Sequence, residues 1–418
     1  MNLARFVLRG RLRMKSIFAV ILCLLAVSAE SATLPGFRVE LLGSTAGFVS
    51  SLAVDSKGTI YYTTTSGSIF RLADGQSSLV ARVTTEATGN SGLLGMALID
   101  DNTAAVHYTT INQTYDVISR IDLLTGLETE VHRFACDIDV PERGSSAEHH
   151  GGNPTVGPDG SIFVGIGDYG AGLIASLPEW NAGKIFRIAP DGGVTQFARG
   201  LRNPFDLIWD DANQRVIVPD NGPARGDEIN IIVEGANCGW PFTFAGNPPV
   251  PGTAAPAYVF ENTVAPTGTL ALNHANPQLR SGVLLGSFVT KAIYFFPDID
   301  AKPLPDPIAL IERETGSVID VAQSRHGDIV FATGNSIDRL VLPLRGDCNG
   351  DGRVNREDVA ALERELADAP EPAYAAQGGT YAGSWGCDAN GDGIIDTADR
   401  NELIRIVSPR RRAARSGQ

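Results

Sequence analysis

The sequence predicts an all-β fold, a six-bladed β-propeller, followed by a small α-helical domain that carries two calcium loops of the EF-hand type. Three observations predict this arrangement. Between about residues 33 and 343, short apolar strands alternate with Gly/Asp-rich turns, and no convincing amphipathic helix occurs. The strand-turn-strand unit recurs six times. After Leu342 the composition changes, and two loops rich in Asp and Asn each precede a short helical pattern.

The repeat determines the predicted architecture. Each unit has an apolar strand, a Gly/Asp turn, a second strand and often a third that begins Gly-x-Ile. Six units over about 310 residues give about 50 residues each, the size of a four-stranded propeller blade. An array of β-sandwiches is the alternative, but it would not explain the fixed order within the unit. The units begin at Ser51, Gly95, Asn153, Phe205, Gly282 and Val318.

The segment FRVELLG, residues 37–43, precedes the first unit and could supply the strand that closes the ring. The turns DSKG, GPDG and SRHG have the composition of hairpin connections. In a propeller, ligand sites lie on one face near the central channel, where the loops of several blades converge. We therefore expect a site built from loops that are far apart in the sequence.

Residues 1–29 have the pattern of a secretory signal peptide. They contain five positive charges and no acid, then the apolar run SIFAVILCLLAVSA, which ends in Val27-Ser28-Ala29. The chain is therefore expected to be secreted or periplasmic. No later apolar run reaches the roughly 18 residues that a membrane-spanning helix needs. Removal of this segment would change the formal net charge from −14 to −19, which disfavours nucleic acid and anionic lipid as partners. Residues 409–418 form a short basic tail.

Four cysteines remain after such a cleavage, an even number that permits two disulfides in an exported protein. The simplest pairing places one disulfide in each part of the chain, Cys136 with Cys238 and Cys348 with Cys387. Two pairs of free thiols are the alternative.

The two C-terminal loops carry oxygen ligands at the alternating positions 1, 3, 5, 9 and 12 and a backbone carbonyl at position 7, as a seven-coordinate Ca²⁺ requires. Gly352 and Gly393 occupy the sharp turns, and position 12 is Asp instead of Glu in both loops. Acidic turns without a metal are the alternative. The predicted ligands are Asp347, Asn349, Asp351, Arg353, Asn355 and Asp358 in the first loop, and Asp388, Asn390, Asp392, Ile394, Asp396 and Asp399 in the second.

Each loop lacks an incoming helix and is followed by a short helical pattern, VAALEREL or ELIRIV. In this form the segment 346–408 resembles a type I dockerin. The resemblance implies docking onto a cohesin-bearing protein. The spacer from Pro370 to Gly386 is longer and less regular than is usual in that family, and loop positions 10 and 11 differ between the two copies. A calcium-binding clasp with a purely structural role is the alternative.

Three stretches of the predicted propeller contain polar and charged side chains that could bind a ligand or transfer a proton. GNSGLLGMAL begins at Gly89, and AEHHGGNPTVGPDGSIFVGIGD begins at Ala147. The third, from Arg199 to Pro241, contains Arg-Asn-Pro, Gly-Pro, Asp-Glu-Ile-Asn and Gly-Trp-Pro in that order. Over most of residues 37–342 the chain thereby resembles the glucose/sorbosone dehydrogenase family of soluble quinoprotein sugar dehydrogenases.

This resemblance implies roles for individual residues. His149, two residues before Gly152, is the candidate base for the sugar hydroxyl, while hydride passes to pyrroloquinoline quinone (PQQ) held by Ca²⁺. The carbonyls of Gly222 and Pro223 are the expected Ca²⁺ ligands, and Asp227 and Glu228 are expected to support that loop. A histidine of the rim and a turn cap at a strand entry are the respective alternatives. The remaining predicted cofactor contacts are Asn90, Arg202, Asn203, Asn221 and Lys291.

The chain departs from the family pattern in its cations. Ser317 and Ile319 occupy the stretch where the enzymes have arginines, and Asn153 replaces an arginine that is common after the glycine. The quinone has three carboxylates, and leaving them without partners in a partly buried pocket costs several kcal/mol.

Two functions therefore follow from the sequence. One is a PQQ- and calcium-dependent oxidation of aldose sugars by an exported protein that the dockerin-like segment tethers. The other is a non-catalytic propeller that binds a carbohydrate or a protein. A calcium-dependent lactone hydrolase is a third, weaker reading, because the Arg-Asn-Pro and Asp-Glu-Ile-Asn order argues against it.

Overall fold

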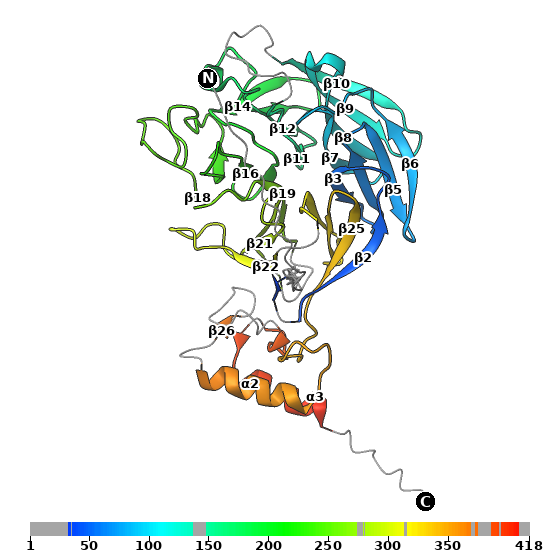
Figure 1. The fold of residues 1–418 in the computed structure, drawn as a ribbon, viewed down its shortest axis with the longest axis vertical. Coiled ribbons are helices and arrows are strands. Elements are labelled where there is room, and N and C mark those ends of the chain that lie inside the picture. Colours follow the sequence, from blue (N-terminus) through cyan, green and yellow to red (C-terminus); the bar gives the residue numbers. More distant parts are fainter. Residues whose placement is uncertain are drawn as a thin grey trace, which may run out of the picture. The chain divides into compact units, whose positions relative to one another are not determined.

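The computed structural model describes residues 32–34, 36–136, 148–273, 279, 281–312, 316–368, 373–374, 386–392 and 394–408. The predicted signal peptide and the basic tail lie outside these residues. Within them, six antiparallel sheets form the blades of a propeller, which confirms the predicted fold (Figure 1). No helix in this described part is long and apolar enough to cross a membrane.

The first three blades follow the chain, and each runs outward from the strand named first. Blade 1 contains β3 (Val49–Val54), β4 (Ile60–Thr64), β5 (Ser68–Ala73) and β6 (Gln76–Arg82). Blade 2 contains β7 (Leu93–Asp100), β8 (Thr103–Thr109), β9 (Tyr115–Asp122) and β10 (Glu128–Ala135), with η1 (Ile111–Gln113) between β8 and β9. Blade 3 contains β11 (Thr155–Val156), β12 (Ile162–Ile166), β13 (Lys184–Ile188) and β14 (Val194–Arg199), with α1 (Gly172–Ala175) between β12 and β13.

The remaining blades repeat the pattern, and two of them recruit N-terminal strands. Blade 4 contains β15 (Ile208–Asp210), β16 (Arg215–Asp220), β17 (Glu228–Val233) and β18 (Tyr258–Val259). Blade 5 contains β19 (Pro266–Ala271), β20 (Val283–Ser287), β21 (Ile293–Phe296), β22 (Ile308–Glu312) and the short β1 (Ala32–Thr33). Blade 6 contains β23 (Asp320–Gln323), β24 (Ile329–Ala332), β25 (Ser336–Val341) and β2 (Arg38–Ser44).

The N-terminal strand closes the ring, as the sequence predicted. β2 pairs antiparallel with β25, from Arg38 opposite Val341 to Ser44 opposite Ser336. The outer strand of blade 6 thus comes from the start of the propeller and its three inner strands from the end. This pairing joins the two ends of the propeller through backbone hydrogen bonds.

Apolar side chains pack between neighbouring blades instead of forming one central core. Among the described residues, six clusters lie at blade-to-blade contacts. Ile118 of blade 2, for example, packs in one cluster with Ile162 and Val164 of blade 3. The blades can therefore bury their faces while the ends of the inner strands stay open for a site.

The C-terminal part has a small core of its own. It contains α2 (Arg356–Asp368), α3 (Thr397–Val407) and the short strands β26 (Ala373–Tyr374) and β27 (Ile394–Ile395). Leu362 of α2 and Leu403 of α3 are fully buried in a cluster with Cys348 and Cys387, which form a disulfide.

The second predicted disulfide is wrong. Cys136 and Cys238 are both buried, but no disulfide joins them. Cys136 lies in the cluster between blades 2 and 3, whereas Cys238 lies in the cluster between blades 3 and 4. Their spacing in the sequence gave no information about which side of blade 3 each thiol occupies.

Candidate functional site at the centre of the propeller

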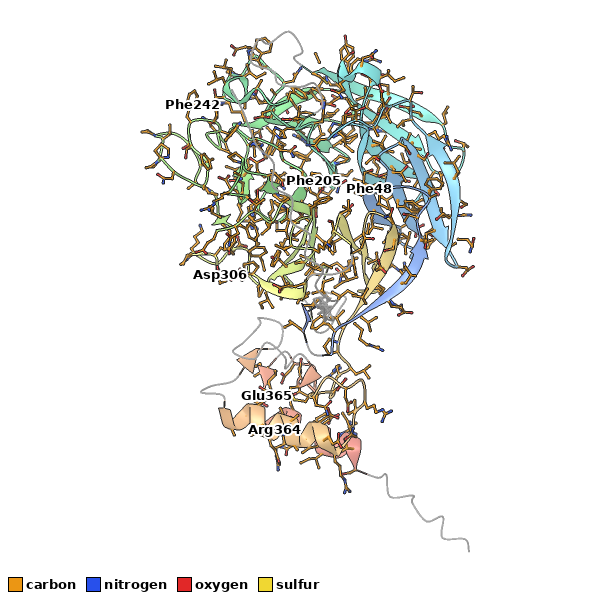
Figure 2. All side chains as sticks on the ribbon, in the orientation of Figure 1. Phe48, Phe205, Phe242, Asp306, Arg364 and Glu365 are labelled. Atoms are coloured by element: carbon orange, nitrogen blue, oxygen red, sulfur yellow. A yellow bond between two sulfur atoms is a disulfide. The ribbon has the colours of Figure 1, made fainter. Side chains whose placement is uncertain are left out.

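A cavity of about 310 Å³ lies where the loops of all six blades meet. The predicted residues Asn90, Asn203 and Asn221 line it, and so does Ile319. Phe48 and Phe205 line it as well and are labelled in Figure 2. No charged side chain is among the described residues of its lining. The other lining residues are Val49, Ser50, Thr65, Gly89, Ser91, Leu93, Leu94, Gly151, Ala265, Pro266, Thr267 and Phe288.

His149 is held by a buried carboxylate. Its Nδ1 lies 2.7 Å from Oδ1 of Asp168, and the histidine side chain is 12% exposed against 2% for the aspartate. The backbone of His149 has φ of 53°, in the left-handed region that non-glycine residues seldom adopt. Gly167 permits this conformation, because a Cβ there would lie 1.9 Å from the His149 carbonyl oxygen. The fold therefore keeps the backbone of His149 in a costly conformation and places its imidazole beside an acid.

Asp168 is fixed by further donors. Its Oδ1 accepts a hydrogen bond from the Gly170 amide at 2.8 Å, and its Oδ2 accepts one from Nε1 of Trp240 at 2.8 Å. The stretch that begins at Ala147 ends in the pair Gly167-Asp168, but no role was predicted for Asp168. The signal was present in that motif, whereas the contact with Trp240 of blade 4 has no signature in either stretch.

Arg202 occupies a position next to the predicted calcium loop. Its Nη1 donates to the carbonyl oxygens of Asn221 and Gly222, at 2.8 Å each, and its guanidinium carbon lies 5.8 Å from the centre of the Trp240 ring. The Gly222 carbonyl is one of the expected Ca²⁺ ligands. A cationic side chain therefore already faces the Gly222 carbonyl, one of the two carbonyls that the sequence assigned to a cation.

Buried acids shape this loop. Asp227 accepts hydrogen bonds from the amides of Gly222, Val264 and Ala265 at 2.8 to 2.9 Å. Glu228 accepts from the Asn230 side chain and from the Ala245 amide. Asp227 thus contacts the loop directly at Gly222, whereas the partners of Glu228 lie outside the loop, and support of a calcium loop by the two acids stays a prediction.

Asp220 anchors the other side of the same loop. Its carboxylate accepts from the amides of Arg202 and Asn203, at 2.9 and 2.6 Å. Burial, followed by the nearby charge of Glu228, raises the pKa of Asp220 to about 7. The predicted residues Arg202, Asn203, Asn221 and Gly222 thus form one hydrogen-bonded unit, which also contains Asp220.

Two of the predicted site residues, Lys291 and Pro223, lie outside this hydrogen-bonded unit. Lys291 lies in the turn between β20 and β21, half-buried with φ of 55°, and is not among the cavity lining. Pro223 is half-buried in the loop after Gly222. The carbonyls and buried acids suit Ca²⁺, a hard cation that prefers oxygen ligands. For a cofactor with three carboxylates, the described part of the site offers Arg202 as its adjacent cation and amides otherwise, so the fit is incomplete.

The two C-terminal loops share one internal pattern. In the first, the position-12 acid Asp358 accepts from the amides of Asn349 and Asn355. In the second, Asp399 accepts from the amides of Asn390 and Asp396. The same two loop positions are therefore tied to the last acid in both copies.

The acids of these loops crowd together. Burial and then the charge of Asp358 raise the pKa of Asp347. Burial also raises the pKa of Asp399, to which Asp388 and Asp392 add. Carboxylates that lie this close disfavour one another's ionisation, and a bound cation would stabilise their ionised forms.

Comparison with known proteins places this geometry in a family. The model of the glucose/sorbosone dehydrogenase family matches residues 49–342. The chain belongs to the glucose/sorbosone dehydrogenase family. The model of the type I dockerin domain matches residues 345–408, so this family member carries a dockerin domain after its propeller.

Relatives of this glucose/sorbosone dehydrogenase family member include sugar dehydrogenases. Quinoprotein glucose dehydrogenase B of Acinetobacter calcoaceticus is 27% identical over 218 residues, which cover 39% of this chain and 42% of that protein. Aldose sugar dehydrogenase YliI of Escherichia coli is 23% identical over 224 residues, covering 47% and 60%. The chain thus spans about half the length of the curated relatives it matches.

Solved structures share the fold. The PQQ-bound aldose sugar dehydrogenase of Streptomyces coelicolor has a TM-score of 0.62 at 22% identity, covering 74% of this chain and 99% of that one. The apo form of the soluble aldose sugar dehydrogenase of Escherichia coli has a TM-score of 0.62 at 19% identity, covering 73% and 99%. At these identities the likeness concerns the propeller itself.

Proposed function

We propose that this chain oxidises an aldose sugar, with His149 as the general base and with PQQ and Ca²⁺ as cofactors. The observation that carries the proposal is the hydrogen bond of 2.7 Å between His149 and the buried Asp168, where His149 lies two residues along the chain from Gly151 of the cavity lining. Family membership and sugar dehydrogenases among the relatives support the same reaction class.

The pair is suited to proton abstraction. Asp168 accepts from Nδ1, so Nε2 of a neutral His149 carries the lone pair that can take a proton from a sugar hydroxyl. The carboxylate then stabilises the imidazolium that forms, without itself being protonated. When bound, the quinone supplies the hydride acceptor.

The hydrogen-bonded loop unit would hold the cofactors together with Asn90, Pro223 and Lys291. The carbonyls of Gly222 and Pro223 would bind Ca²⁺, with Asp227 holding the loop through the Gly222 amide and Glu228, the next residue, as the second supporting acid. Arg202 would meet a carboxylate of the quinone after leaving the carbonyls of Asn221 and Gly222. Polar contacts would come from Asn90, Asn203, Asn221 and Lys291.

Reconstitution tests the proposal. The purified chain is titrated with PQQ and Ca²⁺, and dye reduction is measured with a panel of aldoses. We expect a change in quinone absorbance and turnover with at least one aldose, both requiring Ca²⁺. Turnover in His149→Ala should fall by about 10²-fold or more, while His132→Ala, a histidine on the outer strand β10, should retain it. Absence of an absorbance change and of turnover would exclude this activity.

One observation favours a second function, a propeller that binds a carbohydrate or a protein without catalysis. The described cavity lining contains aromatic and apolar side chains but no charged one, and Ile319 takes part in it. This alternative predicts that sugar or protein binding, measured by calorimetry, survives His149→Ala unchanged while no oxidation occurs.

For the C-terminal domain we propose two Ca²⁺ ions and a cohesin-bearing partner. The shared hydrogen bonds of Asp358 and Asp399 and the dockerin match support it. Export through the segment 1–29 would make the protein secreted or periplasmic. The exported chain would contain the propeller at 33–343 and the docking domain at 346–408. Calcium calorimetry on wild type and on an Asp347→Ala/Asp388→Ala variant tests it, and equal binding by both proteins would contradict it.

A further inference from the structure

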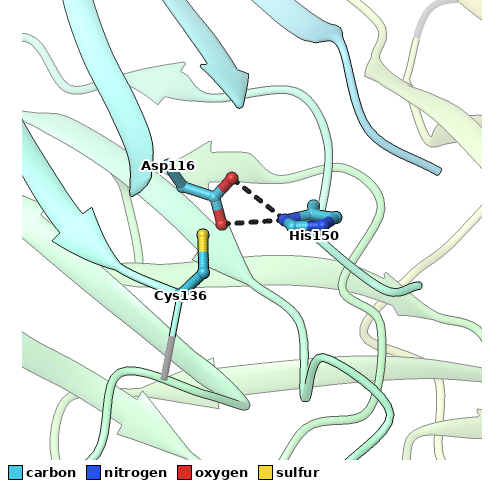
Figure 3. A group of neighbouring side chains, drawn as sticks. All are labelled: Asp116, Cys136 and His150. Atoms are coloured by element: carbon cyan, nitrogen blue, oxygen red, sulfur yellow. Dashed lines mark hydrogen bonds and ion pairs between the residues drawn. The ribbon is translucent and has the colours of Figure 1, made fainter. Parts of the chain in front are cut away.

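A second polar cluster lies in the core between blades 2 and 3, and the function proposed above does not use it. Asp116 at the start of β9, Cys136 just after β10 and His150 before β11 each offer a ligand atom. These three atoms lie within 4.8 Å of one another, and all three residues are buried (Figure 3). Segments from two blades thus bring nitrogen, oxygen and sulfur ligands to one point.

His107 on β8 supplies a lone pair that the fold leaves unsatisfied. Its Nδ1 lies 2.9 Å from the Gly152 carbonyl oxygen, which can only accept, so Nδ1 carries the hydrogen. In the neutral ring, which burial favours by lowering the pKa of His107, Nε2 is then an acceptor. This fully buried Nε2 has no hydrogen-bond partner among the described residues and lies 3.9 Å from Oδ1 of Asp116. Two acceptors therefore face each other with no donor between them.

The ring of His150 is also incompletely satisfied. Its Nδ1 lies 3.1 and 3.3 Å from the two carboxylate oxygens of Asp116, while its buried Nε2 has no partner in the described part of the chain. Asp116 itself accepts from the hydroxyls of Thr109 and Tyr169, at 3.0 and 2.8 Å. The carboxylate is thus oriented by neighbours in the manner usual for a metal ligand.

The chemistry of the donors selects the metal. Ca²⁺ takes six to eight oxygen ligands, whereas Zn²⁺ takes four from Cys, His and carboxylate. Tetrahedral zinc with bonds of about 2.0–2.3 Å separates its ligand atoms by about 3.3–3.8 Å, so the atoms of Asp116, Cys136 and His150, within 4.8 Å of one another, must approach by at most about 1–1.5 Å. A thiolate and a carboxylate also balance the charge of Zn²⁺, which leaves a buried site neutral.

We propose that Asp116, Cys136 and His150, with His107 as the fourth ligand, bind a structural zinc ion. Binding replaces the thiol proton of Cys136, which is released to solvent, and leaves both imidazoles neutral. The ion would join β8, β9 and β10 of blade 2 to the segment that leads into blade 3. His150 follows His149, and Tyr169 follows Asp168, so the zinc would also fix the backbone on both sides of the candidate catalytic pair.

Metal analysis of the full chain tests this site. The protein is purified without a histidine tag, reduced mildly, incubated with zinc and calcium, and dialysed before its metals are counted. We expect about one tightly bound zinc per chain in wild type, and a loss of about tenfold in Cys136→Ser and in His107→Gln. Cys238→Ser, which removes the other buried thiol of the propeller, is the matched control and should keep its zinc.

Cobalt substitution gives a readout that does not depend on a variant that folds poorly. Wild type and Cys238→Ser loaded with Co²⁺ should show a thiolate-to-cobalt charge-transfer band and the intense visible bands of a tetrahedral ion. Wild-type protein that retains no zinc after dialysis, or a cobalt form without the thiolate band, would overturn the proposal. Equal zinc in wild type and Cys136→Ser would overturn it as well.

Discussion

The conformation of His149 is unusual enough to require an explanation at the scale of the residue. A left-handed backbone at a non-glycine residue costs on the order of 1–3 kcal/mol and persists only where the surroundings enforce it. Here the enforcing contacts are the hydrogen bond to Asp168 and the close approach of Gly167 to the His149 carbonyl. Such strain is concentrated at functional sites, which agrees with a base held in a fixed direction.

Asp168→Asn should separate the role of Asp168 from simple packing. His149 and Trp240 bond to different oxygens of Asp168, and the amide keeps an acceptor at only one of these two positions. The wrong tautomer of His149 would then be stabilised, and we expect kcat to fall by about 10²-fold or more while the sugar KM changes little. Steady-state kinetics of the PQQ- and Ca²⁺-loaded protein check this.

Asp159→Asn is the matched control for that variant. Asp159 belongs to the same blade, but its side chain is 50% exposed and pairs with Arg187 on the surface. Its kinetics should equal those of wild type. A kcat of Asp168→Asn within about threefold of wild type would contradict a positioning role for the carboxylate.

At the scale of the element, the strand β2 illustrates how a propeller is held closed. Six residue pairs connect β2 to β25, although most side chains of β2 are exposed, and Leu41 is 62% exposed. Backbone pairing, at about 0.5–1.5 kcal/mol for each hydrogen bond, therefore contributes more than side-chain burial here.

Removal of the residues before Thr45 should destabilise the propeller by about 3 kcal/mol or more. Leu41→Ser, in contrast, should change the free energy of unfolding by less than about 0.5 kcal/mol. Urea denaturation followed by tryptophan fluorescence measures both changes. Equal stability of the truncated and full proteins would mean that β2 does not close the ring.

The disulfide Cys348–Cys387 links the two predicted calcium loops, because Cys348 is the second residue of the first loop and Cys387 directly precedes the second. Closing a loop with a sequence separation of 39 residues contributes about 4 kcal/mol in the chain-entropy model. Reduction should therefore lower the unfolding temperature of the dockerin domain and leave the propeller transition in place. Calorimetry with and without reductant checks this, and a Cys348→Ser/Cys387→Ser variant should behave like the reduced protein.

The elements could be predicted from the sequence because each blade repeats a local pattern. Strand alternation and turn composition placed the blades, and FRVELLG was predicted correctly as the closing strand. Asp168 contacts Trp240, and His107 lies near Asp116. The number of residues between the two members of each pair follows no repeat of the sequence, so the strand pattern could not predict either contact. The pairing of Cys136 with Cys238 failed for the same reason. The sequence showed that Ile319 lies in the stretch where the enzymes of the family have arginines, but only the structure placed it in the cavity wall.

At the scale of the whole molecule, two buried acids connect the inner strands around the central channel. Asp206 of blade 4 accepts from the Thr269 amide of blade 5. Asp320 of blade 6 accepts from the amide of Leu52 in blade 1 at 2.7 Å. Asn153 of blade 3 donates to both acids. These links therefore join five of the six blades.

Ionisation of the same two acids is unfavourable in the folded protein. Burial and the charge of Asp320 raise the pKa of Asp206 well above its ordinary value, and burial raises the pKa of Asp320 to about 6. Asn153 stands where the family commonly has an arginine, so a counter-charge that could have lowered both pKa values is replaced by a neutral amide. The folded protein consequently binds more protons than the unfolded chain between about pH 4 and pH 7.

Stability should accordingly fall as the pH rises through this window. Because the folded-state pKa values are raised, their stabilising contribution is complete below about pH 4 and is lost as the pH passes the folded values. We expect the stability of wild type relative to Asp206→Asn to decrease by more than about 1 kcal/mol from pH 5 to pH 7. Over the same range, ionisations other than that of the neighbouring Asp320 affect both proteins equally, and the lost acceptor of the amide gives a constant offset. Urea denaturation of both proteins at several pH values measures the difference, and parallel pH profiles would contradict the raised pKa of Asp206 in the folded protein.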